Sequence, residues 1–151
     1  MIDYNKLKQL RSESQVSFSL CKKALEETHN DIEKSKKLLK KWGVEKAEKK
    51  AHRETKAGGI FTYVHHNKKI AALIELQSET DFVSGNKDFQ MLGTELAMQA
   101  ASVPASNLTA LLAQEYIREQ GKTIDNLVKE AILKFGENIK IARFLRWELG
   151  E

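Results

Sequence analysis

Thr80-Asp81-Phe82-Val83 is the segment of this chain whose side chains are best placed to act on another molecule. It sets a carboxylate beside a large aromatic ring, shortly after an apolar run over residues 70–76. Where the chain leaves the end of a strand, the sheet can hold such a pair in a fixed position, with Asp81 and Phe82 pointing outward. The pattern therefore predicts a wedge that binds a partner, and not a pocket that carries out bond chemistry.

The same segment also has a purely structural interpretation. Asp81 is suited to cap a helix, because its carboxylate can accept backbone N–H groups of the first turn. Phe82 would then turn back into the core of the protein. The tetrapeptide alone favours this second interpretation, and other segments of the chain shift the balance toward the wedge.

Groups that could support catalysis or bind a metal are few and poorly spaced. The adjacent His65 and His66 would point to opposite faces of a strand, so they do not form a chelating pair. The single cysteine, Cys21, excludes a cysteine-rich zinc site and fits the apolar side of a helix. Gly58-Gly59 lacks the spacing of a phosphate-binding loop. We expect no catalytic residue, no metal and no cofactor.

Composition indicates a globular protein of a reducing compartment. The chain has 151 residues, of which 41% are hydrophobic, enough for a modest core without disulfides. One cysteine suits the cytoplasm. No apolar run approaches the roughly 20 residues that cross a bilayer, and the first residues lack the apolar core of a signal peptide. We expect a cytoplasmic protein with no membrane contact.

The net charge of +4 is unevenly distributed. Residues 1–57 contain 15 Lys or Arg against 9 Asp or Glu, whereas the remainder is slightly acidic. A basic surplus is compatible with RNA binding, but these lysines alternate with glutamates at helical spacing, as on a solvated helix face. Aromatic residues spaced for stacking on bases are missing there. We therefore expect no direct nucleotide or nucleic-acid binding.

The first third of the chain predicts three short helices. Asp3 can cap the first helix, and the second begins near Ser17. Asn30 and Glu33 have the spacing of a capping box for the third, which Gly43 is placed to end. These helices would form a small bundle with a core of Leu7, Leu10, Leu25, Leu38 or Leu39, and Trp42.

The rest of the chain predicts an α+β core behind a solvated helical connector. Two β runs joined by a polar turn form a hairpin, and a last β-rich segment completes a three-stranded antiparallel sheet packed with helices. The expected domains are a three-helix module (1–43), a helical linker (44–57) and the α+β core (58–151). Within that core, strands are expected at 60–64, 69–76 and 138–149, and helices around 92–101, 108–116 and 124–135.

Four segments in order resemble the translation elongation factor Ts family. They are Leu10-Arg11 with Cys21-Lys22-Lys23-Ala24-Leu25, then Asn30-Asp31-Ile32-Glu33, then Thr80-Asp81-Phe82-Val83, and finally Gly136-Glu137-Asn138-Ile139-Lys140-Ile141. The resemblance implies a guanine-nucleotide exchange factor for elongation factor Tu. It also implies a first module similar to a ubiquitin-associated domain, followed by a linker and an α+β core.

The resemblance implies a set of residues that contact the partner. The wedge of residues 80–83 would enter elongation factor Tu and perturb its Mg²⁺ and phosphate site. Secondary contacts would come from the first module and from a helix end beside the wedge. These secondary residues are Arg11, Phe18, Ser19, Lys22, Phe135 and Gly136.

The chain also departs from the family pattern. Ser14-Gln15 stands where Thr-Gly is usual, and Leu20 stands where an acidic residue is common. Because Gly takes positive φ at little cost, Gln15 is expected to alter the loop backbone. The core has room for one of the two related halves found in longer relatives. Short members of the family pair, so the resemblance implies a homodimer.

Two other classes of function remain open at this point. A three-helix module can bind ubiquitin-like proteins through an apolar patch in its first loop, where this chain offers Val16 and Phe18. The basic first third is also compatible with an RNA-binding adaptor. Phosphate binding would fall steeply with ionic strength, whereas wedge binding would depend on Phe82.

Overall fold

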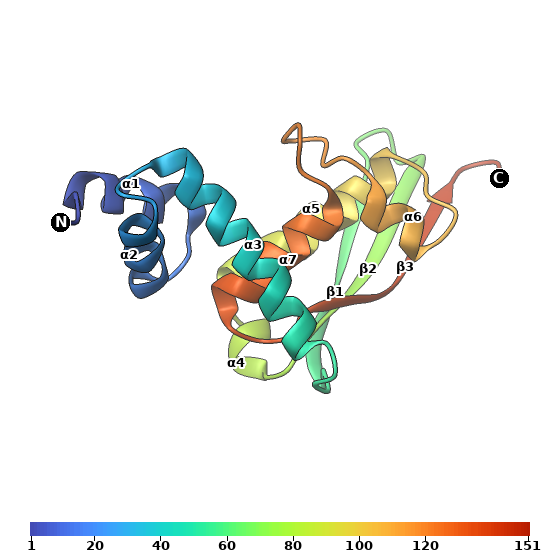
Figure 1. The fold of residues 1–151 in the computed structure, drawn as a ribbon. Coiled ribbons are helices and arrows are strands. Elements are labelled where there is room, and N and C mark those ends of the chain that lie inside the picture. The colour runs from blue at the N-terminus through green and yellow to red at the C-terminus, as the bar shows by residue number, and fades with distance from the viewer.

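The computed structural model describes residues 1–151 and has an α+β fold (Figure 1). A helical bundle at the N-terminal end is followed by a three-stranded antiparallel sheet packed with helices, which confirms the predicted fold class. The elements in chain order are α1 (Tyr4–Ser14), α2 (Phe18–Glu27), α3 (Ile32–Lys50), β1 (Ala57–Val64), β2 (Ile70–Ser78), α4 (Asp81–Ser84), α5 (Lys87–Ser102), α6 (Leu108–Ala113), α7 (Ile124–Phe135) and β3 (Lys140–Glu148).

The first two helices begin where their capping residues predict. The Asp3 carboxylate accepts the backbone N–H groups of Asn5 and Lys6, and the Ser17 hydroxyl accepts that of Leu20. The apolar sides of α1, α2 and α3 meet in a small core. Its buried members include Leu7, Leu10, Cys21, Ala24, Leu25 and Leu39, while Leu38 and Trp42 pack at its margin.

The predicted cap of the third helix is wrong by one residue. The Asp31 side chain, and not that of Asn30, caps α3 by accepting the Lys34 N–H at 3.0 Å. Asn30 has a positive φ of 63° and belongs to the turn before the helix. Its amide oxygen accepts the Asp3 N–H at 2.9 Å, so Asn30 ties the start of α1 to this turn.

The predicted end of the third helix at Gly43 is also wrong, because α3 continues to Lys50. Gly43 is buried where α3 crosses α7, and a β-carbon there would lie 3.2 Å from the Lys129 carbonyl oxygen. Ala47, one turn further on, belongs to the main core. The first half of the expected solvated linker therefore packs against α7. The division at residues 43 and 57 stays a prediction, and α3 runs across its first boundary.

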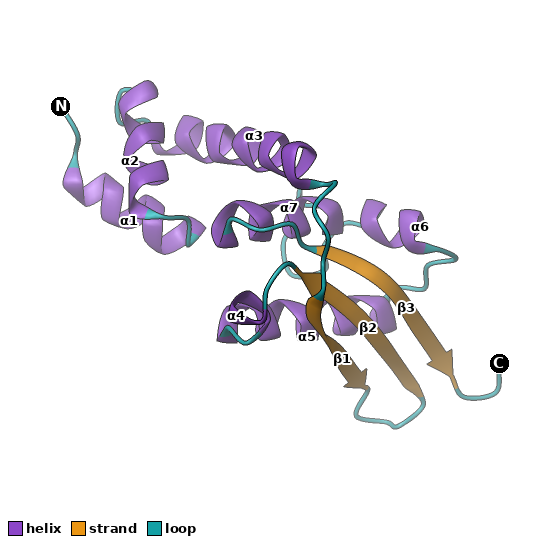
Figure 2. Ribbon diagram, turned by 90° about the horizontal axis from the view of Figure 1, so that it is seen from below, coloured by secondary structure: helices purple, strands orange, loops and turns teal.

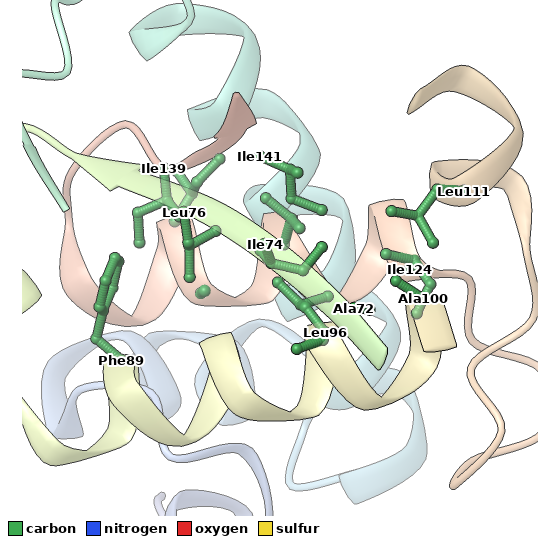
Figure 3. Close-up of a cluster of buried hydrophobic side chains, with 14 of the residues drawn as sticks. Ala72, Ile74, Leu76, Phe89, Leu96, Ala100, Leu111, Ile124, Ile139 and Ile141 are labelled. Carbon is green, nitrogen blue, oxygen red and sulfur yellow. The ribbon is translucent and has the colours of Figure 1, made fainter. Parts of the chain in front are cut away.

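The three strands form an antiparallel sheet in the order β1-β2-β3. The helix α5 packs on one face of the sheet, α7 contributes to the same buried cluster, and α3 lies on α7 (Figure 2). Inward residues of the strands meet the helices in one buried cluster, whose members include Ile74, Leu76, Phe89, Leu96, Ile124, Ile139 and Ile141 (Figure 3). This cluster is the main core, and it positions α4 and the segments beside it.

The opposite face of the sheet carries exposed apolar side chains. On the central strand Leu73 lies beside Leu145, and the neighbouring Ala71 lies beside Trp147, which is 70% exposed. Ile60 and Val64 of β1 extend the same face and are also exposed. We call these side chains the outer sheet face.

The remaining helices lie at their expected positions with two changes of length. The helix expected around 92–101 begins earlier, at Lys87, and runs to Ser102. The helix predicted over 108–116 ends at Ala113, and Tyr116 lies in the loop beyond it. α7 ends at Gly136, as predicted, with the positive φ of 72° that glycine adopts easily. None of the helices combines the length and the apolar character that crossing a bilayer requires.

Candidate partner-binding site

Phe82 lies on a single short helix that follows the central strand. β2 ends at Ser78, Thr80 caps the next helix by accepting the Val83 N–H, and α4 then runs from Asp81 to Ser84. The Phe82 side chain is 92% exposed. Its predicted outward orientation is confirmed, and the interpretation that places it in the core is wrong. Asp81 is the first residue of α4, is exposed, and is not its cap.

Val83, the neighbour of Phe82, has the opposite orientation. Its side chain is only 6% exposed and packs in the main core. This orientation does not agree with the prediction that Val83 contacts the partner, since a buried side chain offers no surface to a second molecule. Val83 fixes α4 to the core instead. Phe82, the preceding residue of the same turn, therefore points into solvent.

Three hydrogen bonds hold the residues before α4 against the segment after α7. Glu137 accepts the Thr80 backbone N–H at 3.1 Å with one carboxylate oxygen and the Thr80 hydroxyl at 2.7 Å with the other. In return Glu79 accepts the backbone N–H of Asn138 at 2.6 Å. Each segment thus provides a carboxylate for a backbone N–H of the other. We call this arrangement the 79/137 junction.

The end of α3 joins the same junction. The Lys50 ammonium donates to the Gly136 carbonyl oxygen at 2.7 Å, and the Asn138 side-chain amide donates to the Arg53 carbonyl oxygen at 2.9 Å. The Arg53 guanidinium lies 3.6 Å from the Glu79 carboxylate. Burial, followed by the positive charge of Arg53, lowers the pKa of Lys50 below its ordinary value.

Phe135 and Gly136, the predicted contacts beside the wedge, lie at this junction. Gly136 is exposed and directly precedes Glu137. Phe135 is half-buried and meets Phe89 edge to face, with ring centroids 6.3 Å apart. The structure therefore brings the exposed Gly136 next to the base of α4, whereas much of Phe135 supports the core.

The predicted contacts of the first module form a second surface on α1 and α2. Arg11 and Phe18 line a hollow of about 330 Å³, whose other lining residues are Leu7, Lys8, Ser12 and Gln15. Phe18 is 52% exposed, Ser19 is exposed and Lys22 is half-buried. Figure 1 shows α1 and α2 at one end of the molecule and α4 on the core, so these residues and Phe82 are two separate surfaces.

The loop between α1 and α2 keeps the backbone that a glycine would favour. Gln15 ends α1 in the left-handed conformation with φ 60°, and its backbone N–H donates to the Arg11 carbonyl oxygen. The expected change of loop backbone is therefore not found at this residue. Val16 next to it is 4% exposed, which leaves only Phe18, the first residue of α2, as an exposed apolar side chain there for binding ubiquitin-like proteins.

The residues of the 79/137 junction are the part of the site that sequence reasoning missed. Lys50, Arg53 and Glu79 were not predicted to have a role, and Glu137 and Asn138 contributed only to the resemblance. The bonds between Glu137 and Thr80 join residues 57 positions apart, a separation at which periodicity and capping rules give no signal. The glycine that ends α7 is the one local indication that the chain turns there.

The fold and its surfaces define a protein that acts by binding. Its exposed aromatic residue lies on a short helix that the 79/137 junction holds in place. The family model for elongation factor TS matches residues 79–151. The chain is 36% identical to elongation factor Ts of Thermosipho melanesiensis over all of both chains. It is 36% identical to that of Fervidobacterium nodosum over 96% of each, and 42% identical to that of Aquifex aeolicus over 94% of this chain and 51% of that protein.

The chain belongs to the elongation factor Ts family, whose members are non-catalytic nucleotide exchange factors for elongation factor Tu. This confirms the family resemblance and the expectation that the protein is not an enzyme. The alignment with the Thermosipho protein runs over 196 positions, whereas this chain has 151 residues. Some segments of that relative therefore have no counterpart in this chain.

Proposed function

We propose that this chain accelerates GDP release from elongation factor Tu by inserting the Phe82 ring between two helices of that partner. The partner holds GDP through contacts to its phosphates and a Mg²⁺ ion. Displacing a helix that bears on the Mg²⁺ site weakens those contacts. Asp81 adds a polar contact at the edge of the ring, to backbone donors or a basic group of the partner. The observation that carries this proposal is the 92% exposure of a large aromatic ring.

The mechanism requires no bond chemistry. An exchange factor binds the nucleotide-free partner more tightly than the loaded one, and by linkage the nucleotide and the factor then weaken each other equally. A tenfold weakening corresponds to about 1.4 kcal/mol. Burying a phenylalanine side chain contributes about 1.5 to 3 kcal/mol. One inserted ring is therefore sufficient to weaken GDP binding by tenfold or more.

The first module supplies a second contact in this proposal. Arg11, Phe18, Ser19 and Lys22 face the nucleotide domain of the partner, while Gly136 and the exposed part of Phe135 contact it beside α4. Two exposed side chains, Arg11 and Phe18, around the hollow on α1 and α2 support this part. The module thereby holds the partner while Phe82 acts on it.

We further propose that two copies of this chain pair through the outer sheet face. Leu73, Leu145 and Trp147 are large apolar side chains exposed on adjacent strands. Contiguous exposed apolar surface on a sheet is typical of a protein interface. The face is self-complementary in type, as a two-fold interface requires, because its apolar side chains meet identical ones on a second copy.

The test of the exchange function is the rate of fluorescent GDP release from purified elongation factor Tu, with and without this chain. We expect Phe82→Ala to slow the stimulated release roughly ten- to hundredfold, since the lost burial is about 1.5 to 3 kcal/mol. Its free energy of unfolding should change by no more than about 0.5 kcal/mol, because the ring is exposed in the free protein.

A matched control is Ile117→Ala, which truncates another exposed apolar side chain, in the loop after α6. This variant should release GDP at the rate of the unaltered chain. Equal slowing by the two variants, or no slowing by Phe82→Ala, would contradict the proposed role of Phe82. Repeating the assay at high salt separates apolar wedge binding from phosphate binding, which falls steeply with ionic strength.

A further inference from the structure

The helix that carries Phe82 is too short to hold its own orientation. α4 contains four residues, and a helix of one turn is unfavourable unless other contacts fix it. Its C-terminal side is closed locally, since the Gly85 N–H donates to the Asp81 carbonyl oxygen at 2.9 Å. Val83 fixes its inner side. The capping residue Thr80, which precedes α4, is therefore the remaining point that determines the orientation of α4.

Two side chains outside the helix hold Thr80: the Ser78 hydroxyl donates to its carbonyl oxygen at 3.0 Å, and the Glu137 carboxylate binds its N–H and hydroxyl. Both carboxylate oxygens of Glu137 accept from Thr80, one from the backbone N–H and the other from the hydroxyl. Two bonds from one planar carboxylate fix rotation as well as position, which a single hydrogen bond does not. The same hydroxyl oxygen also accepts the Val83 N–H, so the bond to Glu137 orients the cap itself.

Glu137 is in turn held by a rigid surrounding. It follows Gly136, whose carbonyl oxygen accepts from Lys50, and precedes Asn138, whose backbone N–H donates to Glu79. Asn138 is buried. The carboxylate thus starts from a backbone that is fixed on both sides, and it transmits that position to Thr80.

We infer that Glu137 is a positioning residue for exchange: its carboxylate fixes Thr80 and thereby the direction in which Phe82 leaves the surface, without itself contacting the partner. The inference rests on the proposed function of Phe82. It separates two tasks, because Phe82 provides the apolar contact and Glu137 ensures that the contact is already oriented before the partner arrives.

The first test is a double-mutant cycle on stimulated GDP release. Glu137→Ala is expected to slow release about tenfold when Phe82 is present and to have no effect in the Phe82→Ala background. Thr80→Ser keeps both donors and should remain close to the unaltered rate, whereas Thr80→Val loses the hydroxyl and should be slow. Equal slowing by Glu137→Ala in both backgrounds would overturn the inference, since Glu137 would then act independently of Phe82.

The second test uses the free protein and needs no partner. Amide hydrogen exchange at Ser84 and Gly85, whose N–H groups donate to Thr80 and Asp81, should accelerate at least tenfold in Glu137→Ala, with α5 unchanged. Glu115→Ala is the matched control, because Glu115 is an exposed carboxylate that accepts the Gly121 N–H in a distant loop. Unchanged exchange at α4 in Glu137→Ala would overturn the inference.

The two tests distinguish this inference from the proposed function. If Phe82→Ala leaves GDP release unaltered, the proposed function of Phe82 fails, and the role of Glu137 in exchange fails with it. If Phe82→Ala slows release but Glu137→Ala does not, only the positioning role of Glu137 is overturned.

Discussion

Gly43 of α3 lies against the backbone of Lys129 in α7: a β-carbon on Gly43 would lie 3.2 Å from the Lys129 carbonyl oxygen. The contact involves backbone on the α7 side, so it cannot be relieved by turning a side chain. It lets the two helices pack with little between them. The long helix that leaves the N-terminal bundle is fixed to the core at this point.

Gly43→Val should therefore separate the two helices. We expect the free energy of unfolding in urea to fall by about 1 to 3 kcal/mol, the usual cost of overpacking a tight contact. Lys41→Val, on the exposed side of the same helix, is the control and should cost less than about 0.7 kcal/mol, a difference of helix propensity. Equal losses in the two variants would show that the contact is not tight.

A second glycine, Gly93 of α5, lies directly beneath the ring of Phe61 on β1, and a β-carbon there would overlap the ring. Alanine is favoured over glycine within a helix by about 1 kcal/mol. We nevertheless expect Gly93→Ala to lower the free energy of unfolding by about 1 to 3 kcal/mol, because the ring must move. Phe61→Leu should cost less stability in the Gly93→Ala background than alone, as measured by chemical denaturation.

The outer sheet face gives a prediction about assembly. Leu73→Lys places a charge at the centre of this face and should convert a dimer into a monomer in sedimentation analysis, because a buried unpaired charge costs several kcal/mol. Met91→Lys, which adds the same charge at an exposed position of α5, should leave assembly unaltered. A monomer for the unaltered chain at all concentrations tested would contradict pairing.

Tyr116 provides a prediction at alkaline pH. Burial, followed by the hydrogen bond that its hydroxyl donates to Glu95 at 2.9 Å, raises the pKa of Tyr116 from 10.0 to about 12. The fold thus favours the neutral phenol, and its contribution to stability is complete below pH 10 and is lost as the pH rises toward about 12. In an absorbance titration of the three tyrosines, Tyr116→Phe should remove the step at highest pH. An unaltered last step would assign it to another tyrosine.

Features that depend on neighbouring residues were predictable from the sequence. The caps at Asp3 and Ser17 and the end of α7 at Gly136 follow from patterns within a few residues. The three-stranded sheet was predictable for the same reason, because short runs rich in apolar and aromatic residues, separated by polar turns or helical patterns, mark the strands. The exposure of Phe82 does not follow from such a pattern, because its own tetrapeptide favours the core and only the resemblance of other segments to the family favoured the wedge.

Features that depend on distant residues were not predictable. Gly43 has the residue type that ends helices, yet contact with α7 outweighs that local tendency and lets α3 continue. The bond that Thr80 donates to Glu137 and the bond that Lys50 donates to Gly136 likewise join segments far apart in the sequence. The exposed residues of the candidate site could therefore be predicted from the sequence. The residues that support them could be identified only from the fold.

Because α3 is continuous, it fixes the distance between the N-terminal bundle and the core. Its 19 residues span about 28 Å at 1.5 Å per residue, with the N-terminal bundle at one end and the bond from Lys50 to Gly136 at the other. The distance between the two proposed contact surfaces is thus set by the length of one rigid helix. A partner whose own domains stand at a matching interval can touch both ends at once, and one with a different interval can touch only one.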